Sequence, residues 1–334
     1  MNFYPKFAED LRIIYKNNLF NQLRPNSPPI RLVWGAGQPN FGDALSPILV
    51  MVLSGRYVKG PNGNNPPLLF GPRLFALGSS LWKAKDGDII WGAGLKATEG
   101  FTARKLQVFA VRGPLTREGL LARGIDCPEV YGDPAILMPY IYKPRIKRRL
   151  GIGIVFHFND LTDRSQFKSS EIKIINVCDH PLRVIELINS CEVVLSSSLH
   201  GIIIAEAYGI PACWVYPTKE VWRASIPQVE FKYKDYYLST GREPVFFKHS
   251  GSFDIDKAVK IALNTDKPKY SPEKLLQAFP FRREDIRSLD ELSRYEIKDV
   301  VIEVPSLQSR VIRKVKSIMW QSAYKCCFKL RRFK

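Results

Sequence analysis

Residues 192–211 read EVVLSSSLHGIIIAEAYGIP and join an apolar strand pattern, a short polar turn and an apolar helix pattern. The turn carries Ser198, His200 and Gly201, and the helix follows it at once. An open α/β sheet presents ligand-binding groups in this way, at the carboxyl end of a strand and beside the free N–H donors of a helix. These donors and a protonatable imidazole suit an anion such as a phosphate or a carboxylate.

The same succession of strand, turn and helix occurs along most of the chain. Strands are predicted at residues 30–34, 88–91, 107–111, 150–156, 173–177, 193–196 and 212–216. Helices are predicted at residues 44–53, 114–123, 181–190, 254–264, 271–279 and 285–296. A basic stretch with prolines at 140–150 interrupts the pattern, which then restarts. We therefore expect an α/β fold with parallel sheets, in an N-terminal domain at 1–145 and a C-terminal domain at 146–309.

Polar side chains gather at the predicted strand ends of both halves. They belong to Asn40, Asp43, Arg112, Asp133, and the pair Ser198 and His200. Because ligands bind at this edge of an open sheet, two such domains predict a cleft between them. Arg112 offers a guanidinium that binds phosphate or carboxylate with two hydrogen bonds. Asp43 either caps the helix at 44–53 or faces a ligand.

Several enzyme classes lack their sequence signals in this chain. The glycine clusters at 35–37 and 92–94 have no third glycine, so a dinucleotide fingerprint is not supported. There is no P-loop, no HExxH and no GxSxG pattern. The six cysteines show no metal-binding spacing and read as reduced thiols of a cytosolic protein. We expect neither a metal nor a bound cofactor.

The segment KYKDYY at 232–237 has two interpretations. A lysine there could contact an anionic donor while the tyrosines stack on sugar rings. Alternatively, the segment is an amphipathic surface strand whose lysines keep their amino groups in water.

The net charge of +18 is unevenly distributed over the 334 residues. Residues 310–334 carry nine lysines and arginines and no acid, which is half of the excess. Apolar residues at helical spacing and aromatic residues accompany them, so the tail favours a membrane-surface helix. A helix packed on the body and a nucleic-acid contact are the alternatives. With no signal peptide and no uncharged stretch of 18 residues, we expect a cytoplasmic protein, peripheral on the inner membrane face.

Six short stretches, taken together, resemble the polysaccharide pyruvyl transferase family. They occur in the family's order and are NFGDAL at 40–45, WGAG at 91–94, VRGPLT at 111–116, YGDPA at 131–135, SSSLHG at 196–201 and KDYY at 234–237. Many members carry Arg-Asp at the third stretch, where this chain has Arg112-Gly113. Any role of that acid is therefore lost here.

The resemblance implies two Rossmann-like domains, arranged as in B-type glycosyltransferases. It implies transfer of the pyruvyl group of phosphoenolpyruvate onto a sugar of a cell-surface polysaccharide, as a ketal, with Arg112 and His200 at the donor. The sugar acceptor would be a polysaccharide unit on a lipid carrier at the inner membrane. Nucleic acid is not an expected partner. The neighbours within the matching stretches are expected to contact the substrates, namely Asn40, Ser198, Leu199, Gly201 and Lys234.

For the reaction, a proton must reach the methylene carbon of phosphoenolpyruvate before a sugar hydroxyl attacks. We hypothesise that His200 binds the phosphate and assists its departure, and that Asp43 or Asp133 orients or deprotonates the hydroxyl. A B-type glycosyltransferase with a nucleotide-sugar donor is the alternative enzyme. A non-catalytic basic protein that binds glycan or nucleic acid is the alternative from another class.

Overall fold

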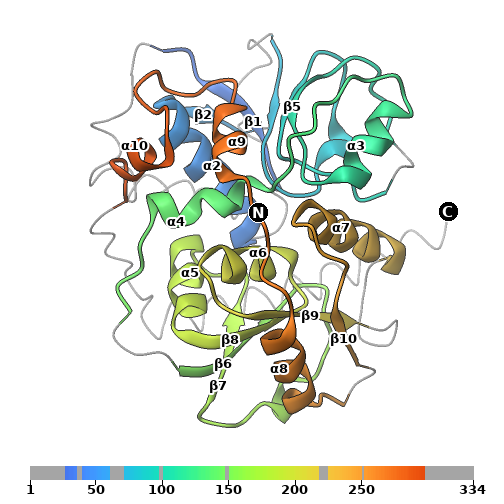
Figure 1. Ribbon diagram of the computed structural model, residues 1–334, viewed down its shortest axis with the longest axis vertical. Coiled ribbons are helices and arrows are strands. Elements are labelled where there is room, and N and C mark those ends of the chain that lie inside the picture. Colours follow the sequence, from blue (N-terminus) through green and yellow to red (C-terminus); the bar gives the residue numbers. More distant parts are fainter. Residues whose placement is uncertain are drawn as a thin grey trace, which may run out of the picture. The chain divides into compact units, whose positions relative to one another are not determined.

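The structure of the chain is a computed structural model that describes residues 27–35, 40–60, 71–97, 101–146, 150–217, 225–249 and 252–297. The described residues belong to one compact unit, Met1–Lys298. They form an α/β fold with two five-stranded parallel sheets (Figure 1). The predicted fold class is therefore confirmed.

The first sheet follows the strand order β2-β1-β3-β4-β5. Its strands are β1 (Ile30–Val33), β2 (Val58–Lys59), β3 (Leu74–Phe75), β4 (Ile89–Trp91) and β5 (Gln107–Ala110). The helix α2 (Phe41–Ser54) connects β1 to β2, and α3 (Pro114–Leu121) follows β5. A parallel bridge between Val111 and Tyr131 extends the pairing beyond β5.

The second sheet repeats this order, as β7-β6-β8-β9-β10. Its strands are β6 (Leu150–Phe156), β7 (Ile172–Asn176), β8 (Cys191–Ser196), β9 (Ala212–Pro217) and β10 (Phe246–His249). In each sheet the direction of the strand order reverses at the boundary between the first and third strands of that half, which are β1 and β3 in one sheet and β6 and β8 in the other. Ligands of doubly wound sheets bind outside the carboxyl ends of the strands at this switch point. The topology thus marks two places, after β1 and β3 and after β6 and β8.

The remaining helices cover the sheets and join the halves. They are α4 (Met138–Ile141), α5 (Pro181–Asn189), α6 (Leu199–Ala207), α7 (Ile226–Ser239), α8 (Ile255–Asn264), α9 (Pro272–Gln277) and α10 (Leu289–Ser293), with 3₁₀ turns η3 (Leu81–Lys83), η4 (Pro134–Leu137) and η5 (Arg164–Gln166). The predicted helix at 285–296 is shorter than expected, and the short strands β2, β3 and β10, of two to four residues, were not predicted.

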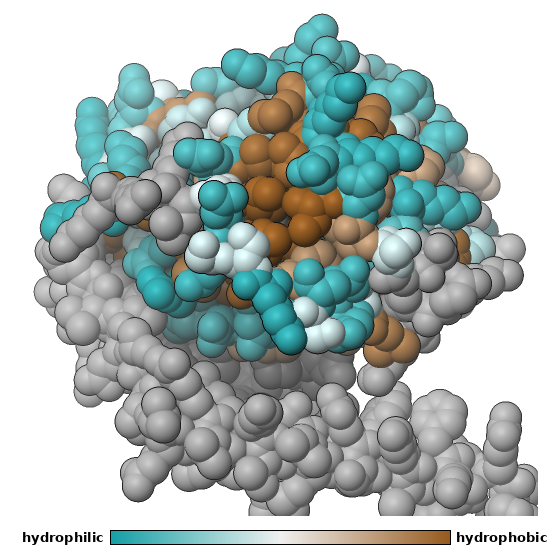
Figure 2. Space-filling model, turned by 90° about the horizontal axis from the view of Figure 1, so that it is seen from below, coloured by the Kyte–Doolittle hydropathy of each residue, from teal (hydrophilic) through white to brown (hydrophobic). Residues whose placement is uncertain are grey.

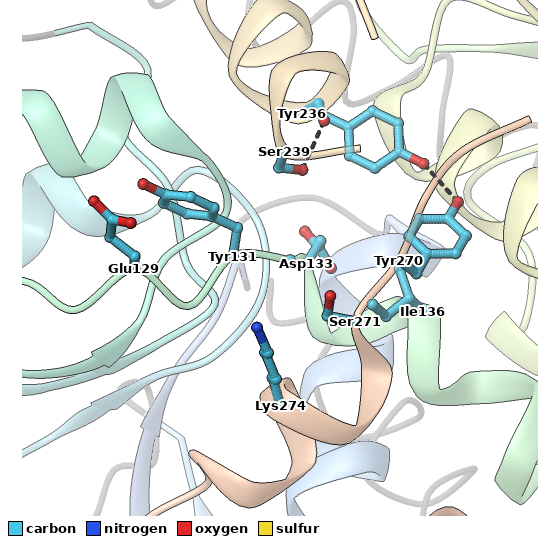
Figure 3. Close-up of a pocket in the computed structure, with 10 residues that line it drawn as sticks. Glu129, Tyr131, Asp133, Ile136, Tyr236, Ser239, Tyr270, Ser271 and Lys274 are labelled. Carbon is cyan, nitrogen blue, oxygen red and sulfur yellow. Dashed lines mark hydrogen bonds between the residues drawn. The ribbon is translucent and has the colours of Figure 1, made fainter. Parts of the chain in front are cut away.

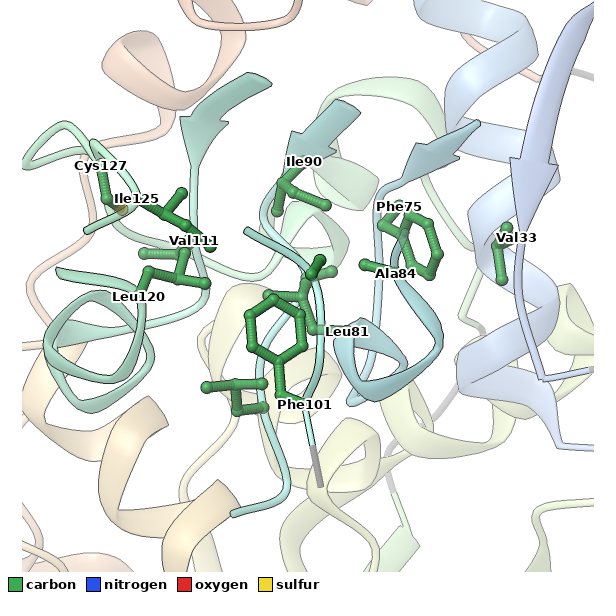
Figure 4. Close-up of a cluster of buried hydrophobic side chains, with 13 residues drawn as sticks. Val33, Phe75, Leu81, Ala84, Ile90, Phe101, Val111, Leu120, Ile125 and Cys127 are labelled. Atoms are coloured by element: carbon green, nitrogen blue, oxygen red, sulfur yellow. The ribbon is translucent and has the colours of Figure 1, made fainter. Parts of the chain in front are cut away.

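The core of the first half forms where the strands meet short connections. Val33, Phe75 and Ile90 come from three neighbouring strands and pack with Leu81 and Phe101 from the loops (Figure 4). Each of these five side chains is at most 2% exposed. Burying a side chain of this size contributes about 1.5–3 kcal/mol. This packing holds the carboxyl ends of β1, β3 and β4 in place.

The segment at 232–237 lies in helix α7, so its interpretation as a surface strand was wrong. Pro227 stands in the first turn of the helix, where its fixed φ is favourable. Val229, Tyr233, Tyr236 and Tyr237 are buried, at the spacing that places side chains on one helical face. Six residues were too few to distinguish this period from strand alternation.

The chain returns to the first half after α8. The indole Nε1 of Trp91 donates a hydrogen bond of 2.8 Å to the carbonyl of Leu275, and Arg283 N–H donates one of 2.9 Å to Leu53. Helices α9 and α10 thus pack beside α4 and the end of α2. The division into domains at residue 145 stays a prediction, and the basic tail at 310–334 lies outside the described residues.

The surface seen from below carries an apolar patch within a hydrophilic rim (Figure 2). Over the whole described surface, the large apolar side chains with more than a third of their surface exposed are Trp82, Leu121, Phe158, Leu161, Ile174, Val245, Phe246 and Leu263. Apolar patches with a polar rim commonly mark contact surfaces.

Within the described part of the chain, no helix has the length and apolar character needed to cross a bilayer.

Candidate functional site

The two switch points supply the residues of one polar cluster. Asp43 follows β1 in the first turn of α2, and Gly78 follows β3. His200 follows β8 in the first turn of α6. A Cβ atom placed on Gly78 would lie 3.1 Å from Asp43 Oδ1 and 3.7 Å from His200 Cε1. The carboxylate and the imidazole therefore flank the same backbone position, although they come from different sheets.

Helix α2 begins one turn earlier than the sequence pattern predicted. Its N-cap is Asn40, whose Oδ1 accepts a hydrogen bond of 3.1 Å from Gly42 N–H. Asp43 is therefore not the cap, and the capping interpretation of that residue was wrong. The amide of Asn40 is used to hold the helix start, which leaves the Asp43 carboxylate to face the cluster. The backbone N–H of Phe41 also donates a 2.8 Å hydrogen bond to Val177 of the second half.

His200 pairs with a carboxylate from the first half. Its Nε2 lies 3.5 Å from Asp133 Oδ2. Both residues are buried, with 7% of His200 and 0% of Asp133 exposed to solvent. This distance is too long for a good hydrogen bond, and Nε2 has no hydrogen-bond partner among the described residues. The other carboxylate oxygen of Asp133 accepts a 3.0 Å bond from Ala135 N–H, which fixes the side chain at the start of η4.

Two glycines leave the space that the cluster occupies. A Cβ atom on Gly42 would lie 2.1 Å from His200 Nδ1, and one on Gly35 would lie 2.3 Å from Asp43 Oδ2. Neither distance is possible without moving the ring or the carboxylate. Both glycines are therefore needed for the close approach of these side chains to the backbone of the first half.

Burial raises the pKa of Asp43, although nearby positive charges oppose the shift. The charges that lower it belong, in decreasing order, to His200, Lys96, Lys232 and Lys83. Desolvation is the larger effect because it disfavours the charged carboxylate. Asp43 thus keeps a proton to higher pH than an ordinary aspartic acid.

The lysine that faces this cluster from α7 is Lys232. Burial, together with the charges of Arg112 and Lys96, lowers the pKa of Lys232 to about 7, and Asp43 raises it in part. Lys234 was the predicted ligand from this segment, but its side chain is exposed. Lys232 precedes the buried Asp235 by three residues and so lies on the same helical face, whereas Lys234 does not.

His157 follows β6 at the second switch point. Burial and the charges of Lys232, Lys96 and His200 lower its pKa well below the usual value. The side chain is half-buried, and its uncharged form therefore prevails at neutral pH.

Arg112 lies away from solvent in a separate cluster that ties α7 to the end of β5. Its Nε donates a 2.9 Å hydrogen bond to Asp235 Oδ2, Nη1 donates one of 2.5 Å to Ser79 Oγ, and Nη2 donates one of 2.7 Å to the carbonyl of Leu95. Thr116 donates from its N–H and its hydroxyl to the same carboxylate. Helices α3 and α7 lie side by side here (Figure 1). A ligand role for Arg112 stays a prediction.

Gly113 allows Asp235 to approach the backbone that follows Arg112. A Cβ atom there would lie 1.9 Å from the backbone oxygen of Asp235 and 2.6 Å from its Oδ1. The glycine leaves room for Asp235. The carboxylate beside Arg112 thus comes from α7.

The other residues of the SSSLHG stretch build the turn. Ser198 and Leu199 are buried at the start of α6, and Ser198 N–H is bonded to Ser196 Oγ at 3.0 Å. A Cβ atom on Gly201 would lie 2.3 Å from Ser196 Oγ, so this glycine lets the helix approach the strand. Contact of Ser198, Leu199 and Gly201 with a substrate stays a prediction.

Sequence reasoning missed Lys96, Gly78 and Asp235 as members of these clusters, and of the two lysines at 232–237 it named Lys234 rather than Lys232. For Lys232 and Asp235 the signal was their spacing of three in an apolar pattern. Lys96 and Gly78 carried none, because their neighbours are set by the sheet order. In the described ranges, no group of three or more histidine, cysteine, aspartate or glutamate side chains could hold a metal ion.

Comparison with known proteins gives a matching family, and the similar proteins include a curated relative and a solved structure. The polysaccharide pyruvyl transferase profile matches residues 3–219. A curated protein of unknown function from Acanthamoeba polyphaga mimivirus is 30% identical over 154 residues, which are 44% of this chain and 54% of that protein. The chain thus spans about half the length of this relative. An uncharacterised protein from Klebsiella pneumoniae has a crystal structure that is 14% identical, with a TM-score of 0.39, over 75% of this chain and 99% of its own.

Proposed function

Because this chain belongs to the polysaccharide pyruvyl transferase family, we propose that it transfers the pyruvyl group of phosphoenolpyruvate onto two hydroxyls of a sugar. The product would be a ketal on an exopolysaccharide or another cell-surface glycan. The observation that carries the proposal is the meeting of Asp43 and His200, from the switch points of two sheets, beside the buried Asp133.

The charges around Asp43 suit a donor with a phosphate and a carboxylate. Lys83 and Lys96 are exposed and Lys232 is half-buried, so an anion can reach them from solvent. All three act on Asp43 electrostatically, which places them around the same carboxyl group. An anion bound there would also restore the positive charge of Lys232, whose pKa of about 7 reflects burial next to other cations.

The reaction requires one proton at carbon before any oxygen attacks. Protonation of the methylene carbon makes the neighbouring carbon electrophilic, and a first sugar hydroxyl adds to it. The bond to the phosphate oxygen then breaks, with its electron pair leaving on phosphate, and a second hydroxyl closes the ketal. Two hydroxyl protons are released, of which one replaces the proton given to carbon and the other leaves with phosphate.

The cluster contains an acid and a base for these steps. Asp43 is the proton donor, because burial raises its pKa and keeps the carboxyl group neutral to higher pH. His200 accepts a hydroxyl proton and passes it to the departing phosphate. Asp133, 3.5 Å from Nε2, stabilises the imidazolium while it exists.

The test is incubation of the purified chain with phosphoenolpyruvate and glycans from its host. The expected result is release of inorganic phosphate, together with a glycan mass increase of one pyruvate ketal. The matched variant His200→Gln should give neither. Release of a nucleotide from a sugar nucleotide by the wild-type chain, without reaction of phosphoenolpyruvate, would replace this proposal with the glycosyltransferase alternative.

A peripheral membrane location is a second part of the proposal. The nine basic residues of the tail at 310–334 would bind anionic headgroups, near a lipid-linked acceptor. A chain lacking these residues should move from the membrane fraction to the soluble fraction of a cell lysate. Unchanged fractionation would refute this location.

A further inference from the structure

A cavity of about 160 Å³ adjoins Asp133 on the side formed by α7 and α9 (Figure 3). Its walls include Tyr131 from the first half, Tyr236 and Ser239 from α7, Tyr270 from the segment before α9, and Lys274 from α9 itself. A single buried water needs roughly 10–15 Å³ by the same measure, so the cavity has room for about ten waters. This is space for a ligand rather than for isolated waters.

One wall of the cavity is held rigid from behind. The hydroxyl of Tyr236 donates to Glu206 Oε2 at 2.6 Å and lies 2.8 Å from the hydroxyl of Tyr270. Arg242 holds both oxygens of Glu206, with two hydrogen bonds of 2.8 Å. Both rings are thereby fixed without a ligand, which lowers the entropy cost of binding.

The polar groups of the cavity suit a neutral polyhydroxy ligand. Lys274 is the one basic residue among those lining it, and Glu129 and Asp133 are acidic, so the balance of charge does not favour an anion. The amino group of Lys274 points toward the gap between Tyr131 and Asp133 (Figure 3). Ser239 Oγ donates its proton to the Tyr236 carbonyl at 2.7 Å and keeps its lone pairs to accept a hydrogen bond. Donors, acceptors and an aromatic face are thus all present.

We propose that this cavity binds a neutral sugar residue of the acceptor glycan. Lys274 donates to its hydroxyls, Ser239 accepts from them, and the ring of Tyr131 covers its apolar face. The identification of the ligand as the acceptor rests on the proposed function. It is supported by Asp133, which borders the cavity and also faces His200. A glycan anchored here has its next hydroxyls beside the base that activates them.

The experiment measures sugar binding separately from turnover. Saturation-transfer NMR would use the full chain with methyl glycosides of galactose, glucose, mannose and N-acetylglucosamine, each without phosphoenolpyruvate. Ser239→Phe fills the cavity from an α7 position that is half-buried, and Lys274→Met removes the exposed donor. Lys267→Met is the control, because Lys267 is also exposed and does not line the cavity.

At least one glycoside should give a saturation-transfer signal with the wild-type chain and with Lys267→Met. The signal should disappear with Ser239→Phe and fall at least fivefold with Lys274→Met, while circular dichroism shows all three variants folded. In turnover assays the two cavity variants should raise the KM for glycan and leave the KM for phosphoenolpyruvate unchanged.

The proposal is overturned if no glycoside binds the wild-type chain, or if Ser239→Phe binds as well as the wild type. Inorganic phosphate would be added to His200→Gln in the presence of the glycoside. A loss of the glycoside signal would show that phosphate binds in the cavity, and this would also overturn the proposal. A different outcome is that Ser239→Phe abolishes sugar binding but the wild-type chain never consumes phosphoenolpyruvate. That result would contradict the proposed function and support the sugar site.

Discussion

The two buried polar clusters of this molecule differ in how completely their hydrogen bonds are made. In the first, Arg112 and Asp235 are both 0% exposed, and their charged groups bond to each other, to Thr116 and to the backbone at 2.7–2.9 Å. In the second, His200 lies 3.5 Å from Asp133, and its Nε2 has no hydrogen-bond partner in the part of the chain that the structure describes. The first cluster joins α3 and α7, whereas the second keeps a group free to exchange a proton.

This difference separates structural from chemical use of buried charge. A buried ion pair with all its bonds made resists rearrangement, because losing one partner leaves an uncompensated charge. A buried histidine with an open position is costly for folding, and such groups concentrate where protons are transferred. The following substitutions test this division.

The largest expected effect is on catalysis, in the second cluster. His200→Gln should lower kcat by about 10²–10⁴-fold, the usual contribution of a positioned acid or base. The melting temperature should change little, because the open nitrogen makes no hydrogen bond that the variant would lose. His180→Gln is the control and should keep its activity. Equal activity of His200→Gln and the wild type would remove the base from the proposed mechanism.

The first cluster should respond in stability. Asp235→Ala leaves Arg112 buried and unpaired, so the free energy of unfolding should fall by about 3–5 kcal/mol in urea titrations. The double variant Arg112→Met with Asp235→Leu should recover most of this loss, since it removes both charges. A double variant as unstable as Asp235→Ala would show that the pair itself, rather than the unpaired charge, stabilises the fold.

Gly42→Ala tests the geometry of the second cluster without changing its chemistry. The added Cβ would stand 2.1 Å from His200 Nδ1, so the ring must shift. A displacement near 1 Å at a reacting group lowers the rate by about 10²-fold. Ser46→Ala is the control on the same helix, because its buried hydroxyl has no hydrogen-bond partner within the described ranges and its loss should leave kcat unchanged. A fully active Gly42→Ala would mean that the imidazole position is not critical.

The smallest expected effect is the pH dependence of donor binding. Lys232 has a pKa lowered to about 7, so it is charged below that pH and neutral above it. The KM for phosphoenolpyruvate should therefore rise as the pH increases through 7, by about fivefold, equivalent to the ~1 kcal/mol of one ion pair. Lys232→Met should lose this pH dependence and Lys234→Met should keep it. A pH profile unchanged in Lys232→Met would assign the effect to another group.

Local pattern in the sequence determined the fold class and most of the strands. β6, β8 and β9 are mainly apolar segments of six or seven residues, and α5 repeats its apolar positions at helical spacing with Pro181 in the first turn. Such signals depend only on residues within one helix or strand, so they can be recognised without the tertiary structure. The six short stretches likewise identified the family that the profile match confirms.

Only the tertiary structure decided which polar residues share a site. Arg112 and His200 both follow strands, but the sheet orders bring His200 to Asp43 and Asp133 and enclose Arg112 with Asp235. Helix α7 turns Lys232 inward and Lys234 outward. Burial and charge at these positions arise from contacts between residues far apart in sequence, such as Arg112 with Asp235 and His200 with Asp133, and no local pattern contains them.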